Sequence, residues 1–186
     1  MRKIIGLLLV AVVALSVTLL ISLRSHSNSS TPTTMTPTTM PNPSTTSTAP
    51  ALPNCTVGNL AISLAQGEAG AGHVNAPLIF KNTGGTTCVM HGYPGVDGRN
   101  ASQSYTQSAT RASASGASTV TLAPGDSASA MVVAVNVPSG NMNTCQNFSV
   151  LFVTPPNTKG FVQVPTTMPG CPGLTVYPVV AGTTGL

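Results

Sequence analysis

A strand, a tight turn and a second strand form the clearest pattern in the sequence, over residues 80–96. An apolar alternation ends just after Phe80, Gly84 and Gly85 follow, and the next apolar segment begins at Cys88. Glycine adopts positive φ without steric cost, so paired glycines between two such segments predict a reversal of the chain. The protein is therefore expected to consist of short antiparallel strands joined by turns.

Alternation of apolar and polar residues continues through most of the chain after Cys55. It predicts strands with one face on a core and one in solvent, as in a β-sandwich, and no later stretch has a helical period. Met131, Val133, Val135 and Val137 are expected on one buried face, as are Phe148, Val150 and Phe152. Proline lacks an N–H, so Pro77 predicts an edge strand or a bulge. The predicted fold is an all-β, Ig-like antiparallel β-sandwich, and its alternating segments are residues 60–64, 74–80, 120–122, 127–137, 148–152, 161–164 and 174–180.

Residues 1–24 predict a transmembrane signal anchor. Residues 4–23 carry no charge, Arg2 and Lys3 precede them and Arg24 follows. Twenty helical residues rise about 30 Å, which is the thickness of the hydrocarbon core of a bilayer. A cleaved signal has an apolar core of about 7–15 residues and a small-x-small cleavage site, which Ser25-His26-Ser27 matches poorly. We expect an uncleaved, single-pass anchor with a cytoplasmic N-terminus, so that the membrane is a partner; the protein is secreted if the segment is cleaved.

Residues 25–54 are rich in Ser, Thr and Pro and predict a disordered tether. Such a tether is either an O-glycosylated stalk or a bare spacer. Pro-rich chain extends by about 3.1 Å per residue, so the tether could span up to about 90 Å. The predicted organisation is an anchor over 1–24, a tether over 25–54 and a disulfide-stapled domain over 55–186.

Charges are few after residue 24: four basic residues stand against three acidic ones. No basic stripe is available to neutralise phosphates, so nucleic acid is not an expected partner. The three carboxylates, on Glu68, Asp97 and Asp126, lie in glycine-flanked turns, which does not favour a facing catalytic pair. We therefore expect neither catalysis nor a cofactor.

Four cysteines lie on the exported side of the predicted anchor, and an even number in an oxidising compartment predicts two disulfides. Three pairings are possible. The sequential one is predicted from the paired spacing, with Cys55 joined to Cys88 and Cys145 to Cys171. None of these cysteines has the CxxC spacing of a zinc site.

An extracytoplasmic metal site, copper above all, is one alternative, because Met90 adjoins His91. Neighbouring strand residues point to opposite faces, so Met90 is expected in the core, His91 at the surface, and no metal ligand among them. A cell-wall polysaccharide-binding module is the other alternative. Such modules use aromatic platforms, and the tyrosines of this chain are Tyr93, Tyr105 and Tyr177, with no tryptophan.

The sequence Gly92-Tyr93-Pro94-Gly95 predicts a structural turn. Proline followed by glycine suits a type II turn, in which Gly95 would supply the positive φ. Tyr93 is expected to lay its ring over the edge of the sheet while its hydroxyl reaches a backbone group.

These motifs together resemble the four-cysteine domain-of-unknown-function family of exported actinobacterial proteins and lipoproteins, including mycobacterial ones. The resemblance covers about residues 55–180 and implies an Ig-like β-sandwich, often behind a lipobox or a tether. This chain lacks the lipobox cysteine, which favours a transmembrane anchor. The family implies no activity, so the expected function is a membrane-anchored, non-catalytic binding or interaction module of the cell envelope. Its possible partner is an envelope protein or wall polymer. The resemblance to the family rests on Cys55 with Leu60, Ile62 and Leu64, on residues 80–88, on residues 92–96 and on residues 122–125.

Overall fold

The computed structural model of the chain describes residues 50–113 and 116–186, which contain thirteen strands and no helix. Among these residues, no helix is long and apolar enough to cross a bilayer. The predicted anchor over residues 1–24 and residues 25–49 of the predicted tether lie outside the described residues. Pro53 and Asn54 already pair with the domain, because the Val89 N–H donates to the Pro53 carbonyl over 2.9 Å.

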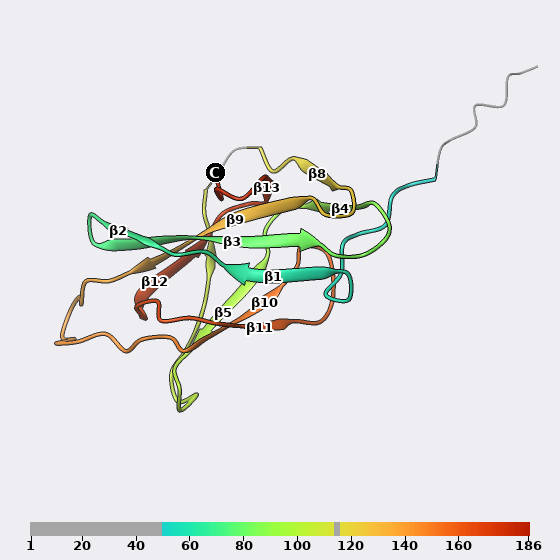
Figure 1. The fold of residues 1–186 in the computed structure, drawn as a ribbon. Coiled ribbons are helices and arrows are strands. Elements are labelled where there is room, and N and C mark those ends of the chain that lie inside the picture. The colour runs from blue at the N-terminus through green and yellow to red at the C-terminus, as the bar shows by residue number, and fades with distance from the viewer. Residues whose placement is uncertain (1–49, 114–115) are drawn as a thin grey trace, which may run out of the picture. The chain divides into compact units, whose positions relative to one another are not determined.

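Two larger sheets and one small sheet make up the fold (Figure 1). The larger sheet has the order β1-β3-β9-β12-β7, with β2 paired to β3 and β13 paired to β9. Its strands are β1 (Leu60–Leu64), β2 (Glu68–Gly70), β3 (His73–Asn82), β7 (Thr110–Arg111), β9 (Ser127–Val135), β12 (Cys171–Val176) and β13 (Val180–Ala181).

The second sheet has the order β11-β10-β5-β6 and consists of β5 (Gly95–Arg99), β6 (Thr106–Ser108), β10 (Val150–Thr154) and β11 (Val162–Pro165). The two-stranded sheet pairs β4 (Cys88–His91) with β8 (Thr119–Leu122). The prediction of an all-β fold with antiparallel sheets is confirmed, with one exception. Strand β7 runs parallel to β12, because the chain leaves the second sheet after β6 and crosses to the edge of the larger sheet.

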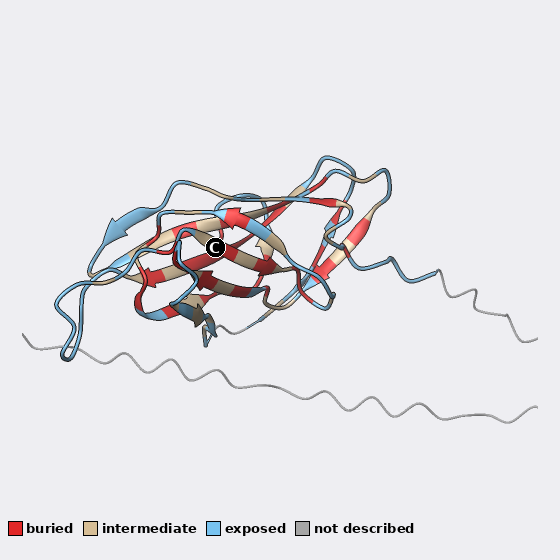
Figure 2. Ribbon diagram, turned by 90° about the horizontal axis from the view of Figure 1, so that it is seen from below, coloured by how far each residue is buried: buried red, intermediate tan, exposed pale blue. Residues whose placement is uncertain are grey.

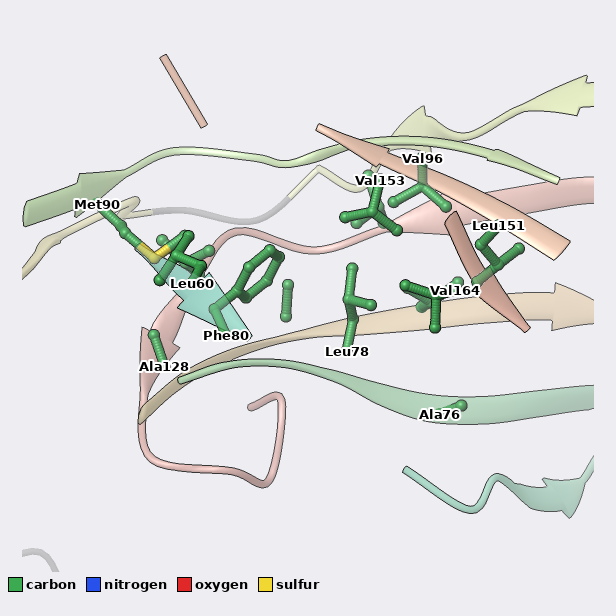
Figure 3. Packing of buried hydrophobic residues seen from close by; sticks show 14 of the residues in the cluster. Leu60, Ala76, Leu78, Phe80, Met90, Val96, Ala128, Leu151, Val153 and Val164 are labelled. Atoms are coloured by element: carbon green, nitrogen blue, oxygen red, sulfur yellow. The ribbon is translucent and has the colours of Figure 1, made fainter. Parts of the chain in front are cut away.

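The core lies between the two larger sheets. Figure 3 shows Leu78 and Phe80 of one layer and Val96 and Val153 of the other pointing into the space between them. All four side chains are buried, and they alternate with exposed or half-buried neighbours along each strand (Figure 2). The alternation predicted for residues 74–80 is thus confirmed at Leu78 and Phe80, and the facing layers form a sandwich-like fold.

Met131, Val133 and Val135 share one face of β9, as predicted, and Met131 is buried, but this face is not the one that enters the core. The side chains of β9 that enter the core are those of Ala128, Ala130, Val132 and Ala134, while Val137 is 53% exposed. The register explains the difference, because Leu78 pairs with Ala130 and Phe80 with Ala128. Directly paired residues share a face of the sheet, so small alanines lie beside the large residues of β3 and make room for them.

Pro77 lies in the central strand β3, not at a sheet edge. The predicted bulge is present beside it, because the pairing register slips by one residue between Leu64–Leu78 and Glu68–Asn75. The Ala65 N–H donates to the Pro77 carbonyl over 2.8 Å, so the Pro77 nitrogen also faces this slip. A missing N–H is tolerated there, because the regular ladder is already interrupted.

Both predicted disulfides are present, joining Cys55 to Cys88 and Cys145 to Cys171. The first links the segment before β1 to the start of β4, and both of its cysteines are buried. The second links the loop before β10 to the start of β12. The pairing predicted from the spacing is therefore confirmed.

Candidate functional site

The predicted structural turn at Gly92-Tyr93-Pro94-Gly95 connects β4 to β5 and so joins two sheets. The residue with positive φ is Gly92, at 95°, whereas Gly95 begins β5 and pairs with Thr154. The predicted type II turn with Gly95 in the left-handed region is therefore wrong. Pairing with β10 requires an extended backbone at Gly95, so the reversal of direction takes place at Gly92 instead.

Tyr93 connects this corner to the rest of the domain through a hydrogen bond and through packing of its ring. Its hydroxyl donates to the Ala112 carbonyl over 2.9 Å, and its ring packs against the core. The Arg111 guanidinium lies 5.6 Å from the ring centroid. The Val179 N–H donates to the Gly92 carbonyl over 2.9 Å. Through Tyr93 and Gly92 this corner contacts residues 111–112 and Val179, which are distant in sequence.

We expect Gly92→Val to lower the free energy of unfolding by about 1–3 kcal/mol, because a β-branched residue is strained at positive φ. Gly95→Ala should change it by less than about 1 kcal/mol, since an added Cβ would lie 3.4 Å from the Thr154 Cβ, an ordinary contact. Urea denaturation of both variants measures the difference. A larger loss in Gly95→Ala than in Gly92→Val would contradict this assignment of the corner.

The Met90–His91 pair lies as the strand geometry predicts, with Met90 buried at 1% exposure and His91 exposed. Within the described ranges, no group of three or more His, Cys, Asp or Glu side chains lies close enough to hold a metal ion. The three carboxylates are spread over the fold. Glu68 is in β2, Asp97 is in β5, and Asp126 accepts a hydrogen bond from the Ala123 N–H over 3.1 Å in the turn before β9.

Two cavities flank the bulge in the larger sheet. One, of about 370 Å³, lies between the bulge and residues 165–169, and none of its lining residues is ionisable. The other, of about 360 Å³, has Glu68 as the one ionisable residue in its lining. Neither lining therefore brings two ionisable groups together.

The outward face of the four-stranded sheet carries a more distinctive group of side chains. Strand pairing places Asp97 beside Phe152, and Arg99 beside Val150 on the neighbouring strand. None of the residues on this side of the sheet is buried. We call this surface the β5–β10 face, and it consists of Gly95, Asp97, Arg99, Thr106, Ser108, Val150, Phe152, Thr154, Phe161, Gln163 and Pro165.

Three planar side chains form a row across this face. The Arg99 guanidinium carbon lies 4.0 Å from the centroid of the Phe152 ring, and the Phe161 ring centroid lies 5.1 Å from that of Phe152. Phe161 is 57% exposed, the second most exposed large apolar side chain among the described residues. The Arg99 Nε is shielded from solvent and has no hydrogen-bond partner in the described part of the chain. Stacking on Phe152 thus holds the half-buried Arg99 cation against this face of the sheet.

Phe152 and Phe161 were not predicted as surface residues, because Phe148, Val150 and Phe152 were expected on one face of a strand. In the structure Leu151 and Val153 point into the core, and Phe152 points outward. Phe148 is buried, but it precedes β10 and packs on Gly98, where an added Cβ would lie 2.8 Å from its ring. The phase of the alternation therefore changes between Phe148 and Val150, which periodicity within one segment does not reveal.

The fold and this face define a class: a small, disulfide-stapled β-sandwich domain with an exposed aromatic–arginine surface on one sheet. Residues 55–181 match the family described as Domain of unknown function (DUF4232), and the chain belongs to that family. The comparisons found no similar curated protein and no similar solved structure.

Proposed function

We propose that this protein is a non-catalytic interaction domain of the cell envelope. In this proposal residues 1–24 anchor the chain in the membrane, residues 25–54 act as a tether, and the domain outside the membrane binds a partner through the β5–β10 face. The uncharged run over residues 4–23 and the two disulfides support an extracytoplasmic location. The resemblance to exported actinobacterial proteins and the two facing sheets support an Ig-like classification.

The row formed by Arg99, Phe152 and Phe161 carries the proposal. Aromatic residues and arginine are enriched at protein interfaces, and the row consists of two phenylalanines and one arginine. The stacked position of Arg99 also reduces the conformational entropy lost on binding. An exposed sheet face with these properties favours a protein partner.

The two alternatives have weaker support. A polysaccharide site needs ring faces open to the sugar, but Arg99 covers one face of Phe152, and the planes of Phe152 and Phe161 are inclined by 49°. A copper site would need Met90 and His91 on one side of β4, and these residues lie on opposite sides.

Site-specific photo-crosslinking in cells tests the proposal. A photoreactive phenylalanine analogue replaces Phe161 in the full chain, and in a matched control the same analogue replaces Val137. These positions have similar exposures, 57% and 53%, but Val137 lies beyond β9 of the other sheet. We expect irradiation to give a discrete crosslinked species from position 161 at several times the yield from position 137. Equal yields at the two positions would contradict the proposal.

A further inference from the structure

We infer that the partner of the β5–β10 face is a second copy of this chain, bound face to face about a two-fold axis. The inference rests on the proposed function, because it names the partner of the same surface. It follows from the placement of the two charged residues of the face and from the apolar residues beside them, and the size of the surface sets the strength of the contact.

Asp97 and Arg99 have opposite charges and are separated by Gly98 on β5. They are the charged residues of the β5–β10 face as defined above, so the face is neutral overall. An interface around a two-fold axis must be self-complementary, so that residue i meets residue j and residue j meets residue i. We place the two-fold axis in the plane of the interface, at Gly98 and perpendicular to β5. Rotation about this axis reverses the direction of β5, so that Asp97 of each copy lies opposite Arg99 of the other copy.

The same axis matches the apolar residues of the neighbouring strand. Phe152 pairs with Asp97 and Val150 pairs with Arg99 along the β5–β10 ladder. When Asp97 lies opposite Arg99 of the second copy, Phe152 therefore lies opposite Val150 of that copy. Sheets that pack face to face are about 10 Å apart, a spacing that side chains from both faces fill.

The outward face of the larger sheet is less suitable because the C-terminal segment covers part of it. The Gly185 N–H donates to the Ser129 hydroxyl over 2.9 Å, and the Met131 N–H donates to the Gly185 carbonyl over 3.1 Å. Ser129 is fully buried as a result. No member of the β5–β10 face is buried within residues 50–113 and 116–186.

The size of the face predicts a weak contact. Four strands about 4.8 Å apart and about five residues long cover roughly 300 Å². A standard interface buries about 800 Å² per partner, so two free domains would associate only transiently. Tethers that end in the same membrane would raise the effective concentration of the domains, and a weak contact then becomes populated. The pairing is therefore to be measured on the full chain in its own membrane.

Charge exchange between two tagged copies tests the inference. Two full-length chains with different epitope tags are expressed together, one of them with the photoreactive analogue at position 161. The measured quantity is the yield of crosslinked product that carries both tags. Arg99→Asp in both copies, or Asp97→Arg in both copies, places like charges opposite each other and should lower this yield at least about fivefold. When one copy carries Arg99→Asp and the other Asp97→Arg, the charges match again and the yield should return.

Lys81→Asp is the matched control, because it makes the same change of charge at an exposed residue of the larger sheet. It should leave the yield unchanged, and oxidised mobility on non-reducing gels shows that each variant has formed its disulfides. Failure of the mixed pair to recover the yield while both variants are oxidised would overturn the inference. A crosslinked product that contains another protein in place of the second tag would also overturn it, yet would leave the proposed function standing. Equal yields at positions 161 and 137 would refute both.

Discussion

Replacing Asn82 by leucine is expected to lower the free energy of unfolding by about 3–5 kcal/mol, one of the largest effects of a single substitution in this domain. The Asn82 side chain is fully buried at the end of β3. Its Nδ2 donates to the Thr86 carbonyl over 2.9 Å and to the Leu122 carbonyl over 3.0 Å, and its Oδ1 accepts from the Gly84 N–H over 3.0 Å. Leucine is similar in size but removes the donor to the Thr86 and Leu122 carbonyls, at about 1–3 kcal/mol for each one that stays buried. The Gly84 N–H keeps a second acceptor, the Asn59 carbonyl, over 3.3 Å.

The side-chain amide of Asn82 takes the place of backbone hydrogen bonds between strands where the chain turns after β3. It holds the glycine turn after β3 to the end of β8, so its loss should loosen residues 83–87 before the sheets separate. Urea denaturation measures the effect, with Lys81→Leu as the control at the neighbouring, exposed position. The control should change stability by less than about 0.5 kcal/mol. If Asn82→Leu stayed within 1 kcal/mol of the parent, water would have to satisfy these backbone groups, contrary to this account.

Removal of the Cys55–Cys88 disulfide by the double alanine variant is expected to cost about 3–4 kcal/mol from chain entropy, with a smaller addition from the lost sulfur volume. The bridge spans 33 residues, and both cysteines are at most 1% exposed. It also holds the start of the domain, where the Cys55 N–H donates to the Val89 carbonyl over 2.9 Å. Without the bridge, the segment before β1 is held to β4 by few backbone hydrogen bonds.

The other disulfide provides the comparison. The Cys145–Cys171 bridge spans 26 residues, so its entropic contribution is nearly the same, but Cys145 is only half-buried. The double alanine variant at Cys145 and Cys171 should therefore lose less stability than the variant at Cys55 and Cys88. Denaturation of both variants beside the parent measures the difference. A greater loss at Cys145 and Cys171 would show that burial is not what separates the two bridges.

Much of the fold could be predicted from local residue patterns. The alternation in residues 74–80 predicts β3 with Leu78 and Phe80 inward, and the paired glycines predict the turn that follows. The spacing of the cysteines predicts the two bridges. Each of these features depends on neighbouring residues or on loop length, which are properties of the linear chain.

The tertiary structure decided which face of a strand is buried and where the chain turns. Strand β9 is apolar on both faces, and only its register with β3 selects the alanines for the core. Gly95 and Gly92 are equally able to adopt positive φ, and pairing with Thr154 extends Gly95 and leaves the turn to Gly92. The row of Arg99, Phe152 and Phe161 combines side chains from β5, from β10 and from the residue before β11, which become neighbours only through strand pairing. Period-two patterns define two faces of a strand, but contact with other strands selects the one that is buried, because burial depends on fitting the side chains opposite.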